Sequence, residues 1–120
     1  MNTAIVLAGG SGKRMNSDIP KQYLMLAGKP VIYYSLKAFQ DNSHIDNIIL
    51  VTAEEYIDYA KENILDKTLS KVSMVIQGGM ERYDSVYKGL QCIKEPGYVF
   101  IHDGARPVSY THLRAHETGA

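Results

Sequence analysis

Short apolar runs alternate with longer segments of helical spacing along this chain, and that alternation restricts the folds open to it. The runs cover residues 3–7, 45–52, 72–77 and 98–101. Their nearly continuous apolar character is typical of strands buried on both faces, because a half-exposed strand alternates polar and apolar residues. Such strands occur in parallel sheets whose two faces are covered by helices, so the runs predict a sheet of that kind.

Three segments between the runs have the spacing of amphipathic helices. The first begins near Pro30, a residue that a first helical turn tolerates well. The second covers residues 54–66 and has acidic residues in its first turn, where the helix dipole favours them. The third runs to Ile93, with Asp84 or Ser85 as its expected N-cap. The alternation predicts an α/β fold with a doubly wound, mostly parallel sheet, although the strand order is not readable.

Composition excludes several classes of function. The chain has 120 residues, which suits one domain, and 45% of them are hydrophobic, which is enough for a packed core. Lys and Arg together number 13, as do Asp and Glu, so no net charge draws the chain to nucleic acid or to an anionic membrane. No apolar run approaches the roughly 18 residues of a membrane span. The single cysteine, Cys92, excludes an internal disulfide framework, and we expect a cytoplasmic protein.

A loop of small residues followed by cations is the main functional signal. The first run leads into a set of small residues and then into three cations: Ala8, Gly9, Gly10, Ser11 and Gly12, followed by Lys13, Arg14 and Lys21. Such a loop can bring backbone N–H groups against a phosphate while positive side chains close over it. The alternative is a tight strand-to-helix turn with solvated lysines, and phosphate binding is the interpretation that the loop favours.

This loop matches neither of two common phosphate-binding patterns. A Walker loop would need glycine in place of Leu7 and serine or threonine in place of Arg14. A dinucleotide fingerprint would need glycine in place of Met15. The remaining pattern suits a triphosphate that is attacked at its α-phosphorus, a reaction that needs fixed positive charge and a metal ion rather than covalent help from the protein.

A second polar segment follows the last apolar run. It contains Asp103 beside a glycine, and a carboxylate at a strand end can bind Mg²⁺ there without competing side-chain bulk. The alternative is that Asp103 forms a helix cap or an Asx turn and that Arg106 pairs with it. His102 is expected to be a structural histidine. In a parallel sheet the binding site lies beyond the carboxyl ends of the strands, an edge that three loops would share: residues 8–15, 78–82 and 102–107.

Three blocks of the sequence resemble those of the 2-C-methyl-D-erythritol 4-phosphate cytidylyltransferases, in the same order and spacing. The blocks are residues 8–15 with 20–23, residues 78–86 and residues 102–107. Ribitol-5-phosphate cytidylyltransferases share the first block and are the nearest alternative. The second block favours the methylerythritol enzymes, because Arg82, Ser85 and Val86 match their pattern, whereas the ribitol enzymes tend to have threonine and isoleucine there. The resemblance implies a Rossmann-like nucleotidyltransferase fold.

The resemblance also implies a reaction, in which CTP and 2-C-methyl-D-erythritol 4-phosphate give a CDP-alcohol and pyrophosphate during non-mevalonate isoprenoid synthesis. Arg14 and Lys21 would be the catalytic cations that stabilise the pentacoordinate α-phosphate and the leaving pyrophosphate. Asp103 would bind Mg²⁺, with Arg82 and Arg106 in supporting positions. The nucleotide contacts would come from Ala8, Gly9, Gly10, Ser11, Gly12, Lys13, Gly79, Met80 and Ser85.

The resemblance covers only part of the family's length. Residues 1–108 resemble the N-terminal part of a single cytidylyltransferase domain, incomplete at the C-terminus, whereas residues 109–120 have no family counterpart and are expected to be disordered or artefactual. The family forms homodimers through an arm that this sequence lacks. We expect the chain to bind nucleotide weakly, with little or no turnover. Two other possibilities stay open, namely a related sugar-nucleotide pyrophosphorylase and a nucleotide-binding fragment without a catalytic role.

Overall fold

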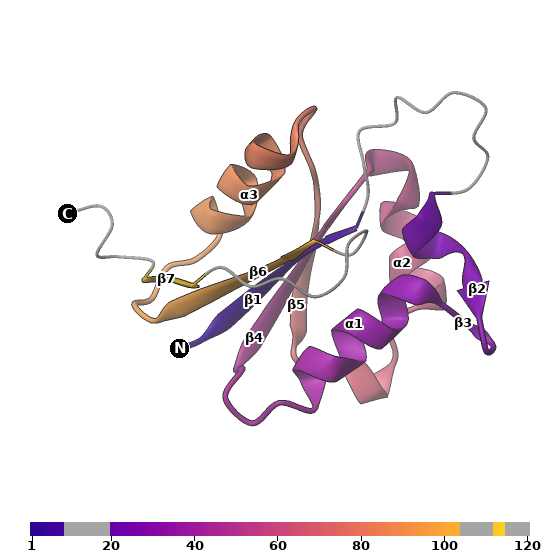
Figure 1. Cartoon of the computed structure of the whole chain (residues 1–120), viewed down its shortest axis with the longest axis horizontal. Helices are drawn as coiled ribbons and strands as arrows, with labels where there is room; N and C mark the ends of the chain where they lie inside the picture. Colours follow the sequence, from indigo (N-terminus) through magenta and orange to yellow (C-terminus); the bar gives the residue numbers. More distant parts are fainter. Residues whose placement is uncertain (9–19, 104–111, 115–120) are drawn as a thin grey trace.

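The computed structural model describes residues 1–8, 20–103 and 112–114, which form a sheet with helices on both faces (Figure 1). The strands of this sheet are β1 (Thr3–Ala8), β4 (Asn47–Thr52), β5 (Val72–Gln77), β6 (Tyr98–Asp103) and β7 (His112–Arg114). Their spatial order is β5-β4-β1-β6-β7. The first four run parallel to one another, and β7 runs antiparallel to β6. The prediction of an α/β fold with a mostly parallel sheet is confirmed.

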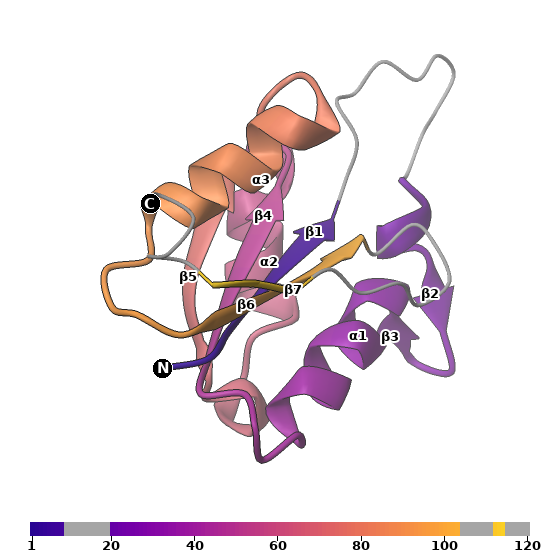
Figure 2. The same cartoon turned by 60° about the vertical axis from the view of Figure 1, so that its left-hand side comes forward.

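The helices divide between the two faces of the sheet. They are α1 (Val31–Gln40), α2 (Ile57–Asn63) and α3 (Arg82–Gln91), with short 3₁₀ helices η1 (Lys21–Tyr23), η2 (Glu54–Tyr56) and η3 (Lys67–Leu69). Alternate residues of the fully buried β1 point to opposite faces. Ala4, Val6 and Ala8 join the cluster under α1 and α2, whereas Ile5 and Leu7 join the cluster under α3. Figure 2 shows α1 and α3 on opposite sides of the sheet, so the doubly wound arrangement is also confirmed.

A small hairpin joins η1 to α1. Its strands are β2 (Met25–Leu26) and β3 (Lys29–Pro30), which pair antiparallel. Ala27 and Gly28 form the turn with φ values of 52° and 89°. Positive φ at both central positions is the pattern of a type I′ hairpin turn, and glycine adopts that conformation without steric cost. Pro30 precedes the first residue of α1 rather than lying within its first turn.

Two helix boundaries differ from the sequence predictions. The helix expected over residues 54–66 is divided into η2 and α2, and the carboxylate of Asp66 caps η3 instead by accepting from the N–H of Thr68 at 2.8 Å. α3 begins before both of its predicted caps. Its N-cap is Glu81, whose N–H donates to the carboxylate of Asp84 at 3.1 Å, so Asp84 acts from the third helical position of a capping box. A carboxylate can cap a helix from either position, and the sequence alone did not distinguish them.

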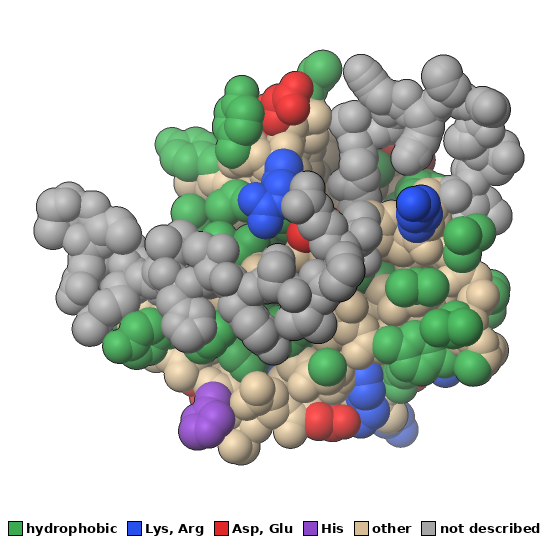
Figure 3. All heavy atoms as spheres, viewed as in Figure 1, with side chains coloured by type: hydrophobic (Ala, Val, Ile, Leu, Met, Phe, Trp, Pro, Cys, Tyr) green, Lys and Arg blue, Asp and Glu red, His purple; other side chains and the backbone are tan. Residues whose placement is uncertain are grey.

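Exposed hydrophobic side chains gather over α3 and over the β2–β3 hairpin (Figure 3). Tyr83 and Tyr87 of α3 are more than half exposed, as are Met25 and Leu26 of β2. No helix within the described part of the chain is long and apolar enough to cross a membrane. Of the segment 109–120, β7 is described and the rest lies outside the described residues, so the origin of this segment stays a prediction.

The close approach of α3 to the sheet gives a test of the core. A Cβ atom at Gly89 would lie 3.0 Å from both Cδ1 and Cγ2 of Ile5. We expect Gly89→Val to lower the free energy of unfolding by about 1–3 kcal/mol, because extra carbon atoms in a packed core force neighbours to move. Urea unfolding measures the change. Ile5→Val removes Cδ1 and should recover part of the loss in the Gly89→Val background, although it costs about 1 kcal/mol alone. Unchanged unfolding of Gly89→Val would contradict this packing.

Candidate functional site

The carboxyl ends of the parallel strands lie in a row along one edge of the sheet. Ala8 of β1 is in register with Thr52 of β4, which is in register with Gln77 of β5. On the other side of β1, Leu7 is in register with Asp103 of β6. The segments that follow these strands therefore start from a common edge, as the sequence predicted, and open parallel sheets bind ligands at this edge.

Seven of the predicted site residues fall within the described part of the chain: Ala8, Lys21, Gly79, Met80, Arg82, Ser85 and Asp103. The others lie outside the described residues: Gly9, Gly10, Ser11, Gly12, Lys13, Arg14 and Arg106. Of the two predicted catalytic cations, the structure describes only Lys21, an exposed residue that opens η1.

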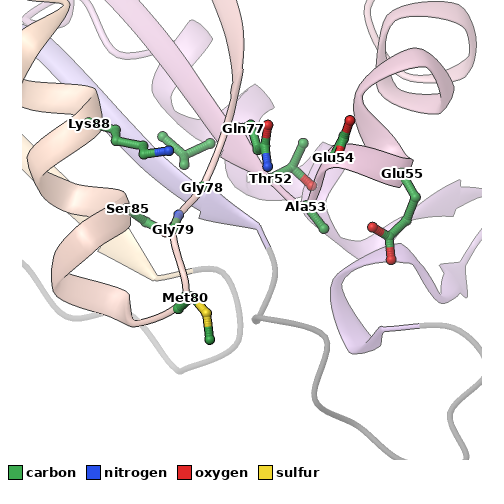
Figure 4. A pocket seen from close by; sticks show the side chains of 11 residues that line it. Thr52, Ala53, Glu54, Glu55, Gln77, Gly78, Gly79, Met80, Ser85 and Lys88 are labelled. Carbon is green, nitrogen blue, oxygen red and sulfur yellow. Dashed lines mark hydrogen bonds between the residues drawn. The ribbon is translucent and has the colours of Figure 1, made fainter.

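A pocket of about 330 Å³ lies at this edge between β4, β5 and the start of α3 (Figure 4). It is lined by Val51, Thr52, Ala53, Glu54, Glu55, Gln77, Gly78, Gly79, Met80, Ser85 and Lys88. Three of the predicted nucleotide contacts are among them, which are Gly79, Met80 and Ser85. The sequence reasoning missed Lys88 and the two glutamates, although Glu54 follows β4 at the same edge and could have been included on that ground.

The glycine pair after β5 is required by the close approach of α3. A Cβ atom at Gly78 would lie 2.6 Å from Oγ of Ser85, and one at Gly79 would collide with Cβ of Asp84. The N–H of Gly79 donates to Oγ of Ser85 at 3.0 Å. The hydroxyl group of Ser85 thus has a fixed acceptor role toward the backbone and still carries a proton that it can donate to a ligand in the pocket.

Arg82 and Asp103 form an ion pair across the edge. Nε of Arg82, the first residue of α3, lies 3.2 Å from Oδ2 of Asp103, the last residue of β6. The side chain of Asp103 is 16% exposed and that of Arg82 is 49% exposed. An ion pair this open to water contributes less than about 1 kcal/mol, so its main effect is to orient the carboxylate. The sequence predicted a supporting role for Arg82 but did not identify Asp103 as its partner.

The donor set around Asp103 fits a magnesium ion only in part. Among the residues that the structure describes, no three side chains of His, Cys, Asp or Glu converge to hold a metal by themselves. Mg²⁺ usually binds through one or two carboxylates together with phosphate oxygens and water. The single carboxylate of Asp103 therefore fits an ion that arrives with a triphosphate, not one held by the protein alone.

His102 has the contacts expected of a structural histidine. Its Nε2 lies 3.2 Å from Oγ of Ser35, and its ring meets Phe39 edge-on with centroids 5.7 Å apart. Burial lowers the pKa of His102 below its usual value, because the charged imidazolium loses its hydration. Nδ1 is buried and has no hydrogen-bond partner among the described residues. These contacts place the ring in the core between β6 and α1.

The sequence reasoning also missed Tyr23 and Thr52. Oη of Tyr23 lies 2.6 Å from Oγ1 of Thr52, which in turn donates to the carbonyl of Ala8 at 3.2 Å. All three residues are buried. Tyr23 belongs to the block of residues 20–23 that carries part of the family resemblance, and that membership was the only signal for it.

Comparison with known proteins identifies relatives of this chain. Residues 2–117 match the family model for 2-C-methyl-D-erythritol 4-phosphate cytidylyltransferase, IspD. The chain is 66% identical over 107 residues to the enzyme of that name from Lachnospira eligens, covering 89% of this chain and 47% of the relative. It is 52% identical over 107 residues to the one from Clostridium novyi, covering 88% and 46%. The chain thus spans about half the length of these curated relatives.

Solved structures give the same result. The 4-diphosphocytidyl-2C-methyl-D-erythritol synthase of Anaerococcus prevotii superposes with a TM-score of 0.67 at 29% identity, covering 90% of this chain and 44% of the other. The 2-C-methyl-D-erythritol 4-phosphate cytidylyltransferase of Francisella tularensis superposes with a TM-score of 0.65 at 34% identity, covering 88% and 45%. The strand-end pocket, the three sequence blocks and these matches agree, and the chain belongs to the 2-C-methyl-D-erythritol 4-phosphate cytidylyltransferase family.

Proposed function

We propose that the protein represented by this chain transfers the CMP moiety of CTP to 2-C-methyl-D-erythritol 4-phosphate and releases pyrophosphate, a step of non-mevalonate isoprenoid synthesis. The observation that carries the proposal is that Asp103 and the pocket beside Ser85 lie at one sheet edge, where the hydrogen bond between Tyr23 and Thr52 also holds η1, the element that contains Lys21. Family membership supplies the identity of the substrates. The chain spans about half the length of its curated relatives, so the reaction is proposed for the full-length protein.

The chemistry needs positive charge more than proton transfer. A phosphate oxygen of the acceptor attacks the α-phosphorus of CTP, and the bond from that phosphorus to the oxygen bridging to the β-phosphate breaks as pyrophosphate leaves. The acceptor is already an anion, so no general base is required. Negative charge accumulates on the pentacoordinate phosphorus and on the leaving group, and preorganised cations there lower the barrier. We assign that role to Lys21 together with Arg14, which lies outside the described residues.

The nucleotide would be held by the pocket and by the loop that follows β1. Ser85 can donate its hydroxyl proton to the base or ribose, since its oxygen already accepts from Gly79. The backbone of residues 78–80 lines the same pocket and offers further polar groups. The remaining contacts are assigned to Met80 and to the loop residues Ala8, Gly9, Gly10, Ser11, Gly12 and Lys13.

Asp103 would hold Mg²⁺ together with the triphosphate. Bound there, the ion would neutralise phosphate charge and orient the α-phosphorus. Arg82 keeps the Asp103 carboxylate in place, and Arg106 would support the same segment. We also propose that the full-length protein works in the cytoplasm and forms a homodimer, both by its membership of the family.

Pyrophosphate release from CTP tests the proposal. Two proteins are compared, namely this chain and an extended protein in which the C-terminal half of the Lachnospira eligens relative follows residue 108 and replaces residues 109–120. The extended protein should turn over with Mg²⁺, CTP and 2-C-methyl-D-erythritol 4-phosphate, and this chain should show little or no turnover. UTP, GTP and dTTP replace CTP in parallel assays, and ribitol 5-phosphate replaces the acceptor. A preference for ribitol 5-phosphate, or for another nucleotide, would overturn the assignment, as would an inactive extended protein.

A further inference from the structure

A series of hydrogen bonds links Tyr23, the last residue of η1, to the ends of β4 and β1. It runs from Oη of Tyr23 to Oγ1 of Thr52 at 2.6 Å and from there to the carbonyl of Ala8 at 3.2 Å. We call it the Tyr23–Thr52–Ala8 chain. The residues at the first link are 29 positions apart in the sequence, and those at the second are 44 apart.

The protons of this chain have one consistent assignment. The threonine hydroxyl carries a single proton, which it donates to the carbonyl of Ala8. Tyr23 must then donate its own proton to Oγ1 of Thr52. Hydrogen bonds aligned in this way strengthen one another in a buried environment, and a buried hydroxyl that loses its partner is destabilising. Burial raises the pKa of Tyr23 to about 12, so its hydroxyl stays protonated and remains a donor near neutral pH.

The ring of Tyr23 is fixed as firmly as its hydroxyl group. It stacks on Tyr56 with ring centroids 4.4 Å apart and planes inclined by 7°, and Tyr59 meets it edge-on at 5.7 Å. Only 3% of Tyr23 is exposed. A side chain held at both its ring and its hydroxyl can position the backbone that carries it.

That backbone also carries Lys21. The two residues share the single turn of η1, in which the N–H of Tyr23 donates to the carbonyl of Pro20 at 2.9 Å and the N–H of Leu24 donates to that of Lys21 at 3.2 Å. Fixing Tyr23 therefore fixes the backbone of Lys21 relative to Ala8. Ala8 directly precedes residues 9–19 in the sequence, and Pro20, the neighbour of Lys21, directly follows them.

We propose that Tyr23 is a positioning residue, whose hydroxyl holds the Lys21 backbone at a set distance from the end of β1 through the Tyr23–Thr52–Ala8 chain. The inference rests on the proposed function, because it requires that Lys21 be one of the cations that stabilise the transition state. A displacement of about 1 Å at a reacting centre costs up to a hundredfold in rate, so a moderate shift of Lys21 should be visible in kcat.

Tyr23→Phe in the extended protein tests this, since it removes the hydroxyl and keeps the ring. We expect kcat to fall about tenfold while KM for CTP changes less. Tyr56→Phe is the matched control. It removes a hydroxyl from the tyrosine that stacks on Tyr23 but does not belong to the Tyr23–Thr52–Ala8 chain of hydrogen bonds, and it should leave kcat unchanged. Thermal unfolding of each variant reports whether the fold is retained. Thr52→Val removes the hydroxyl that makes both hydrogen bonds and should also lower kcat. Thr52→Ser keeps a hydroxyl, so its kcat should be closer to that of the parent protein.

A double-mutant cycle separates positioning from a general structural effect. If Tyr23 acts through Lys21, Tyr23→Phe should cause little further loss of kcat in a Lys21→Ala background. Equal losses in both backgrounds would overturn the inference, and so would equal kcat values for Tyr23→Phe and Tyr56→Phe. Failure of the proposed function is a different result, because the parent extended protein would then show no turnover. If Tyr23→Phe fails to fold, the comparison of Thr52→Val with Thr52→Ser decides the question.

Discussion

In the extended protein, Lys21→Ala is expected to lower kcat for pyrophosphate release by about a hundredfold or more. The ammonium group is assigned to the charge that develops on the α-phosphate and on the leaving pyrophosphate, and removing one such preorganised group costs on this order. Lys21 is exposed, so its replacement should leave the thermal unfolding temperature nearly unchanged. KM for CTP should change less than kcat, because the interaction strengthens in the transition state.

Lys29→Ala is the matched control for Lys21→Ala. Lys29 lies on the neighbouring hairpin, where its Nζ lies 4.9 Å from the ring centroid of Tyr33. It is a cation from the same region of the chain with no role assigned in the reaction, and its replacement should change kcat by less than about twofold. Equal activity of the two variants would show that Lys21 is a solvated surface lysine, which is the alternative for the cations around the loop.

Asp103→Asn is expected to lower turnover by about a hundredfold at low Mg²⁺ and to raise the Mg²⁺ concentration needed for half-maximal rate. Asparagine keeps the shape of the side chain but removes the charge that would hold the ion, so the loss should be in metal affinity rather than in folding. A titration of initial rate against Mg²⁺ at fixed CTP measures both quantities. High Mg²⁺ should restore part of the rate if the metal is carried mainly by the triphosphate.

Asp41→Asn controls for the loss of an ion pair as such. Asp41 pairs with Lys37 at 2.9 Å on the surface of α1, and neither residue lines the strand-end pocket. This variant should leave the Mg²⁺ titration unchanged. An unaltered titration for Asp103→Asn as well would mean that Asp103 serves only as the partner of Arg82.

Much of the fold could be predicted because buried strands and amphipathic helices have local signals. The apolar run at residues 72–77 matches β5 in both bounds, and the proline before Val31 marks the start of α1. The expectation that this run is buried on both faces was wrong, because β5 is the edge strand of the sheet and its side chains are half-buried or exposed. The strand order could not be predicted, because it depends on pairing between segments far apart in the chain. The start of α3 was misplaced because the carboxylate of Asp84 caps the helix from inside it.

The candidate site was predictable to a similar extent. Glycine and charged residues at strand ends indicated Gly79 and Asp103, and parallel strands bring those ends to one edge. The ion pair between Arg82 and Asp103 joins residues 21 positions apart, and no local pattern announces it. Tyr23 was missed for a similar reason, since apart from its place in the block of residues 20–23 nothing marks it, and its partner Thr52 lies 29 positions away.

The central strand raises a question of registry. In a strand with one solvent-exposed face, a register shift of one residue exposes the apolar side chains to water, and this free-energy cost fixes the register. β1 packs against apolar clusters on both faces of the sheet, so a shift of its register by one residue would still place apolar side chains on each face. The size of the side chains, rather than their polarity, distinguishes the two faces of β1. The face toward α1 and α2 carries Ala4, Val6 and Ala8. The face toward α3 carries the larger Ile5 and Leu7, and Gly89 of α3 leaves room for Ile5. The sizes of the side chains in the two layers therefore fix the register of β1. The register in turn sets the position of the Ala8 carbonyl, which accepts the hydrogen bond from Thr52.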